Sequence, residues 1–183
     1  RTTPASRFET LASILLITLA AAAAHLLLAS QFGIYRDSWF LLVGGHIDGP
    51  AKFFDIWSID RPGVAYLFST LYALIGDNLL AYNLIAVGLR LVGALGFFWV
   101  LRLVWPQARL GTLLAALLFV VYPGFVQLPN ALEYTPHVTS MALFVFSVAL
   151  ALQAFRTHSR AAWIALTLAA LMCTGLYLFL MEY

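Results

Sequence analysis

Residues 60–76 read DRPGVAYLFSTLYALIG, an apolar segment that is short for a membrane protein. As an α-helix, the run of about 14 residues at 63–76 would reach about 21 Å, whereas a bilayer core of about 30 Å needs about 20 residues. Pro62 suits the first turn of a helix, and Asp60 is expected to cap it. Residues 76–78, Gly-Asp-Asn, predict a turn at its end. The segment therefore predicts a half-length helix.

The composition around this segment is that of a membrane protein. Of the 183 residues, 63% are hydrophobic and 10% are charged, whereas soluble domains have about 25% charged residues. The mean hydropathy is +0.92. Long apolar runs predict an all-α integral membrane protein with about five transmembrane helices, at about 10–32, 80–104, 110–128, 137–155 and 161–181. Pro106 should end the second of these helices, and Thr135-Pro136 should open the fourth.

The chain, residues 1–183, is expected to form a single transmembrane domain. Because it begins with Arg1 and stops just after an apolar run, we expect it to be part of a longer protein. The sequence has no basic cluster suited to nucleic acid and no glycine-rich phosphate loop. The expected partner is therefore the lipid bilayer, together with molecules held in or beside it.

The distribution of Lys and Arg indicates whether the half-helix crosses the bilayer, because these residues accumulate in short cytoplasmic loops. If 63–76 crosses, only Arg1 and Arg7 lie inside. If it does not cross, the inside gains four further arginines, at positions 102, 109, 156 and 160. We therefore expect a cytoplasmic N-terminus and an external loop, residues 33–79, whose half-helix is interfacial or re-entrant.

The order of features from residue 10 onward resembles that of a known enzyme family. Residues 53–63, FFDIWSIDRPG, place aromatic residues, acids and a basic residue before proline directly ahead of the half-helix. In this loop, and in the span before it and the hairpins after it, the chain resembles the N-terminal half of the GT-C glycosyltransferases. These use polyprenyl-phosphate-linked sugars, and include protein O-mannosyltransferases and the aminoarabinose transferase of lipid A. The resemblance covers nearly the whole chain, and its specific part is the loop.

The resemblance implies a membrane glycosyltransferase that moves a sugar from a polyprenyl-phosphate donor to an acceptor on the outer face of a bacterial plasma (inner) membrane. By the resemblance, Asp37 is the catalytic carboxylate, which deprotonates the acceptor or helps to bind a divalent cation. Asp55 is a second catalytic candidate that would order the loop or the sugar. The cofactor is undetermined beyond such a cation, because the histidines lack the spacing of a metal site.

Two arginines are candidates for binding the donor phosphate. Arg61 precedes the half-helix, where a guanidinium and unpaired backbone amides together favour an anion. Arg90 lies within the second span, where an arginine is costly unless it is paired or hydrated, so it should contact the phosphate or a buried partner. Additional site candidates are Asp60, Glu133 and His137.

Two alternatives to the enzyme stay open. Asn83 and His137 stand where the family commonly has Arg and Asp, which favours a catalytically inactive membrane subunit or scaffold of a larger complex. Other membrane subunits would then be its partners. The other alternative is a transporter or flippase. Transporters have interrupted helices near the membrane midplane, and Pro123-Gly124 and Arg90 are the features that suggest one here.

Overall fold

The computed structural model describes residues 7–27, 29–122 and 131–181, and within these ranges the chain is helical, without a β-strand. The helices are α1 (Arg7–His25), α2 (Ser38–Asp48), α3 (Lys52–Trp57), α4 (Pro62–Ile75), α5 (Leu79–Val104), α6 (Arg109–Val121), α7 (Ala131–Arg156) and α8 (Arg160–Leu180). Four of them, α1, α5, α7 and α8, are long and apolar enough to cross a membrane. The expected all-α membrane protein is confirmed.

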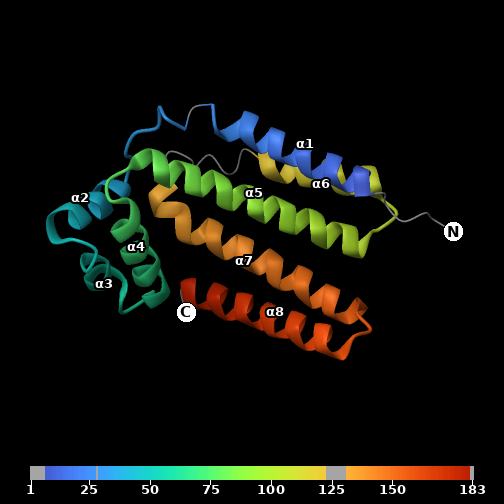
Figure 1. The fold of residues 1–183 in the computed structure, drawn as a ribbon. Coiled ribbons are helices and arrows are strands. Elements are labelled where there is room, and N and C mark those ends of the chain that lie inside the picture. The colour runs from blue at the N-terminus through green and yellow to red at the C-terminus, as the bar shows by residue number, and fades with distance from the viewer. Residues whose placement is uncertain (1–6, 28, 123–130, 182–183) are drawn as a thin grey trace.

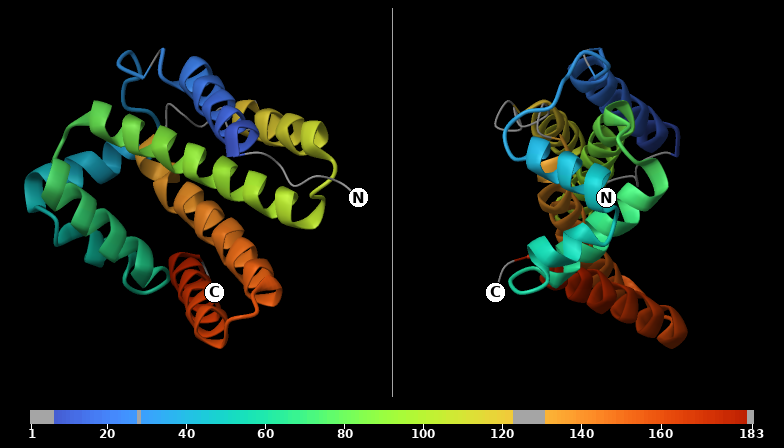
Figure 2. Two further views of the ribbon diagram at one scale, coloured as in Figure 1. Left: turned by 45° about the vertical axis from the view of Figure 1, so that its right-hand side comes forward. Right: turned by 90° about the vertical axis from the view of Figure 1, so that its left-hand side faces the viewer.

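The long helices lie side by side, and the short helices α2, α3 and α4 gather at one end of them (Figure 1). α7 packs between α5 and α8, while α1 and α6 pack against each other and against α5. Two further views show α4 next to the C-terminal end of α8, against which it packs (Figure 2). α5 and α7 approach closely at Gly93 and Gly96, where a Cβ atom would meet Met141 and Phe146 at 3.0 and 2.9 Å.

The core has two separate parts. One is formed by α1, α5 and α6, and its buried residues are Ile17, Ala21, Ala94, Phe98, Ala116 and Val120. The other joins the short helices to the beginnings of α5 and α7, and its buried residues are Leu41, Leu42, Phe53, Val64, Phe68, Tyr82 and Leu132. This second core holds the external-loop helices as one packed unit on the end of the bundle.

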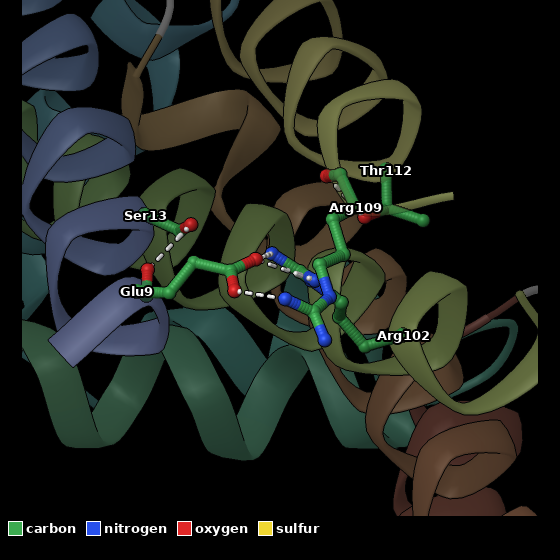
Figure 3. A network of polar contacts seen from close by, with 5 residues as sticks. All are labelled: Glu9, Ser13, Arg102, Arg109 and Thr112. Atoms are coloured by element: carbon green, nitrogen blue, oxygen red, sulfur yellow. Dashed lines mark hydrogen bonds and ion pairs between the residues drawn. The ribbon is translucent and has the colours of Figure 1, made fainter. Parts of the chain in front are cut away.

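An ion-pair network joins three helix ends at the opposite end of the bundle (Figure 3). The carboxylate of Glu9 accepts hydrogen bonds from Arg102 at 3.2 and 3.3 Å and from Arg109 at 2.9 Å. Arg156 donates to the backbone carbonyl of Leu103 at the same end. The start of α1 therefore lies beside the end of α5, so these two helices run antiparallel, and the segment between them begins and finishes at one end of the bundle.

That the half-helix does not cross the bilayer, as the charge distribution indicates, stays a prediction. α4 begins close to the end of α8, where Gly63 approaches Phe179, and its other end leads into the start of α5 (Figure 1). Glu9 was not among the residues singled out in the sequence. The sequence did contain a signal for this network: Glu9 is an acidic residue near the N-terminus, on the predicted cytoplasmic side, where Arg102 and Arg109 were also expected. Which end of the bundle faces the cytoplasm stays a prediction.

Replacing Glu9 by glutamine should destabilise the bundle, because Arg102 and Arg109 would then face each other without a shared anion. We expect a loss of about 1–2 kcal/mol in the free energy of unfolding. Thermal unfolding of the full-length protein in detergent would measure it. The matched control is Asp48→Asn, which removes an exposed carboxylate 3.4 Å from Lys52. Equal melting temperatures for the two variants would contradict the prediction.

The limits of α4 follow largely from its sequence. Pro62 lies in the first turn and Gly76 ends the helix with a φ of 56°, a value that favours glycine. The expected capping by Asp60 is wrong: Arg61 is the N-cap residue, and no side chain caps this helix. Asp60 instead lies 3.6 Å from the Arg61 guanidinium, because the charge beside it attracts the carboxylate more than the backbone amides do.

Two predicted boundaries differ from the structure. The first span was expected to reach residue 32, but α1 ends at His25. The chain then turns: the His25 ring contacts the Val120 carbonyl at 2.8 Å, and the Asn83 amide donates to the Ala29 carbonyl at 2.8 Å. These buried hydrogen bonds satisfy backbone groups that would otherwise need helical partners. Asn83 thus has a structural task.

The fourth span was expected to open at Thr135-Pro136, but α7 already includes Ala131 and has Pro136 inside it. Two hydroxyls add hydrogen bonds to neighbouring carbonyls: Thr135 donates to the Ala131 carbonyl at 2.6 Å, and Thr139 donates to the Thr135 carbonyl at 2.7 Å. α6 matches the first part of the predicted span 110–128. Residues 123–128 of that predicted span, which include Pro123-Gly124, lie outside the described residues.

Candidate functional site

A cavity of about 320 Å³ lies between the short helices and the first turns of α7. It brings together four of the residues singled out in the sequence: Asp37, Arg61, Glu133 and His137. They come from three segments that are far apart in the chain. The remaining wall is mainly apolar, with Phe40, Leu41, Ile56, Trp57, Val64, Phe68 and Pro136. Such a cavity, apolar with a few convergent polar groups, is the usual form of a small-molecule site.

Arg61 is held in place by Trp57 of α3 and by the adjacent Asp60. Its guanidinium lies over the Trp57 ring, 4.4 Å from the ring centroid, and 3.6 Å from the Asp60 carboxylate. Stacking uses the face of a guanidinium, whereas the donors that make planar contacts with an anion lie along its edge. As the N-cap residue of α4, Arg61 also stands where a helix presents unpaired amides. The Arg61 corner of the cavity therefore favours a negatively charged group.

Two carboxylates belong to the same cavity. Asp37 directly precedes α2, next to Arg36, whose φ of 49° is the one positive value outside glycine in the described residues. Glu133 lies in the first turn of α7, and the charges of Asp37 and Arg36 act on it. Oxygen Oε2 of Glu133 is buried and has no hydrogen-bond partner within the described ranges. A buried acceptor of this kind needs a donor, so the cavity suits a ligand with hydroxyl groups.

His137 stands at the boundary between this cavity and two others. A second cavity of about 250 Å³ shares Arg61, Pro136 and His137 with the first and reaches Leu180 and Met181. A third, of about 240 Å³, shares His137 and continues between α7 and α8 along Met141, Phe144, Tyr177 and Met181. The three cavities therefore form a row that leads from the charged residues to an apolar groove.

The structure keeps the other candidates out of this cavity. Asp55 has a side chain that is 74% exposed, and it lies 3.6 Å from Lys52 on the same short helix. Arg90 is buried within α5 and does not line any of the three cavities. Asp60 contributes only through its contact with Arg61. The acidic residue that joins Asp37 in the cavity is thus Glu133.

No group of three or more His, Cys, Asp and Glu residues in the described ranges could hold a metal ion. The divalent cation therefore stays a prediction. Trp57 is the residue that the sequence analysis missed: its place four residues before Arg61, one helical turn away, was the available signal.

Comparison with models of protein families, with curated proteins and with solved structures gives no match. The resemblance to GT-C glycosyltransferases therefore stays a prediction from the sequence.

Proposed function

We propose that the protein is part of a membrane glycosyltransferase that moves a sugar from a polyprenyl-phosphate donor to an acceptor. The observation that carries the proposal is the cavity in which Asp37 and Glu133 face the same space as Arg61 and His137. It combines groups for activating a hydroxyl with groups for holding a phosphate. In this proposal Glu133 takes the catalytic role that the sequence suggested for Asp55, and His137 takes the phosphate-binding role suggested for Arg90.

The proposed reaction is a direct displacement at the anomeric carbon of the donor. Asp37 or Glu133 takes the proton of the acceptor hydroxyl as its oxygen forms the new glycosidic bond. The bond from the anomeric carbon to the phosphate oxygen breaks, and the polyprenyl phosphate leaves with the electron pair. Arg61 stabilises the additional negative charge on that phosphate. His137, which also lines the route to the groove, is a second donor to it.

The row of cavities supports a lipid-linked donor. The groove between α7 and α8 has apolar walls and begins at His137, which also lines the charged cavity. An isoprenoid chain in the groove would place its phosphate beside Arg61. The exposed apolar surfaces of α7 and α8 favour burial in lipid, so such a chain would enter from the bilayer.

The proposal includes sidedness: the N-terminus is cytoplasmic, and the cavity opens on the outer face of a bacterial plasma membrane. It is supported by the arginine-rich bundle end around Glu9, with Arg102, Arg109 and Arg156. The acidic residues Asp48, Asp55 and Asp77 lie in the short-helix region at the other end.

A catalytically inactive subunit of a larger complex is the second candidate function. The surface of α8 favours this candidate. Only 11% of the residues in its apolar stretch are buried in this chain, and residues such as Leu171 and Met172 are exposed. Further helices of the same complex would find an apolar face there. In that case the cavity would still exist, but its carboxylates would not be needed for product formation.

Asp37→Asn in the full-length protein, with Asp55→Asn as the matched control, separates the two functions. Both substitutions remove one carboxylate from the external loop, but only Asp37 lines the cavity. We expect Asp37→Asn to lower sugar transfer from polyprenyl-phosphate hexoses by about 100-fold or more in proteoliposomes, with Asp55→Asn near the parent rate. Equal products from both variants and the parent would reject the enzyme.

A further inference from the structure

A hydrogen-bonded cluster outside the cavity joins α2 to the end of α4. Nδ1 of His46 lies 2.7 Å from Oδ2 of Asp77, and the Tyr72 hydroxyl donates to Oδ1 of Asp77 at 2.7 Å. His46 is in the last turn of α2, Tyr72 is in the last turn of α4, and Asp77 is in the turn before α5. One carboxylate thus accepts hydrogen bonds from both helices.

The backbone next to the cluster is adapted to this close approach. A Cβ atom on Gly45 would lie 2.7 Å from the Tyr72 ring, a distance that real Cβ contacts essentially never show. Only glycine at this position lets α2 come so near to Tyr72. The Tyr72 ring also packs against Phe53 of α3, with centroids 5.6 Å apart. The cluster is therefore one side of a packed junction of three helices.

The junction and the cavity lie at opposite ends of the same two helices. Asp37 precedes the first residue of α2 and Arg61 precedes the first residue of α4, whereas His46 and Asp77 join their far ends. We propose that Asp77 is a positioning residue: it holds α2 on α4 through its hydrogen bonds to His46 and Tyr72, and so fixes Asp37 relative to Arg61. The part about Asp37 and Arg61 rests on the proposed function.

Asp77 is the acceptor in both hydrogen bonds of the cluster. The hydrogen bonds from Tyr72 and His46 hold the pKa of Asp77 below its usual value of 3.8, so this carboxylate stays charged above pH 4. Burial, and then the bond to Asp77, raises the pKa of Tyr72 to about 12, so its hydroxyl remains a donor. On neighbouring α3, Lys52 is occupied by Asp48 and Asp55.

The effect of pH on the junction follows from Asp77. The contribution of Asp77, whose pKa is lowered, is present at neutral pH and is lost as the pH falls below 3.8. The junction is therefore expected to loosen in acid.

Hydrogen exchange of the α2 amides in the full-length protein tests the proposal without any activity. In Asp77→Asn we expect these amides to exchange roughly fivefold faster than in the parent at pH 6. The matched control Asp55→Asn removes an acid from the same three-helix unit and should leave α2 unchanged. Unchanged exchange in Asp77→Asn would overturn the proposal.

Two further variants test the two hydrogen-bond partners of Asp77. His46→Ala and Tyr72→Phe each remove one hydrogen bond to the carboxylate, so the α2 amides should exchange faster in each variant than in the parent at pH 6. If neither variant exchanges faster, these two hydrogen bonds do not hold α2 on α4. Failure of the proposed function would appear separately, as unchanged sugar transfer in Asp37→Asn.

Discussion

Arg61→Ala should lower sugar transfer by about 100- to 1,000-fold, the largest effect that we expect from one substitution in the cavity. The guanidinium is stacked on Trp57 and faces the same cavity as Asp37 and Glu133. Without it, the phosphate would leave with its added charge unbalanced in a mainly apolar cavity. Single-turnover kinetics with a polyprenyl-phosphate hexose in proteoliposomes would measure the loss.

A lysine at position 61 tests the contribution of the planar fork, because it keeps the charge but cannot make a bidentate contact or the same stacking. We expect Arg61→Lys to recover only part of the rate. Lys52→Ala is the matched control, since Lys52 belongs to the same unit of short helices but pairs with Asp48 and Asp55 outside the cavity. If Arg61→Ala and Lys52→Ala reduce the rate equally, Arg61 has no special task at the phosphate.

Gly63→Ala should cause the largest loss of stability, about 1–3 kcal/mol in the free energy of unfolding. A Cβ atom on Gly63 would overlap the backbone carbonyl of Phe179, and a backbone atom cannot move aside as a flexible side chain can. The first turn of α4 would have to withdraw from the end of α8. Thermal unfolding in detergent would measure the effect.

Gly88→Ala on α5 is the matched control, because a Cβ atom there meets nothing within 4 Å. Alanine favours a helix by about 0.5–1 kcal/mol relative to glycine, so this variant should be as stable as the parent or more stable. The two substitutions make the same chemical change in helices of the same protein. If Gly63→Ala were also neutral, the close contact between α4 and α8 would not exist in the folded protein.

Local signals in the sequence were sufficient to predict the half-helix. Pro62 at its start and Gly76 at its end act through their own backbone geometry, so they need no tertiary context. The end of α1 could not be predicted in this way, because an apolar helix can continue as long as nothing competes for its backbone. The competing groups are Asn83 and the Val120 carbonyl, and they come from α5 and α6.

The candidate site was predictable only in part, for a related reason. Asp37 and Arg61 were chosen from the sequence and line the cavity, but their partner Glu133 comes from α7, about 70 residues later than Arg61 along the chain. On α3, adjacent side chains point about 100° apart. Ile56 and Trp57 therefore face the cavity while Asp55 faces solvent. The sequence of a helix of six residues did not indicate which of its faces would be covered.

Pro136 has a consequence for how the two parts of α7 are connected. Because proline has no amide hydrogen, the carbonyl of Leu132 lacks the helical partner that it would otherwise have. The turn that bears Glu133 is thus joined to the membrane-embedded remainder of α7 by a weakened link. Leu132 itself is buried in the core beside Val64 and Phe68, so the place of Glu133 at the cavity depends on side-chain packing more than on the backbone hydrogen bond that the proline removes.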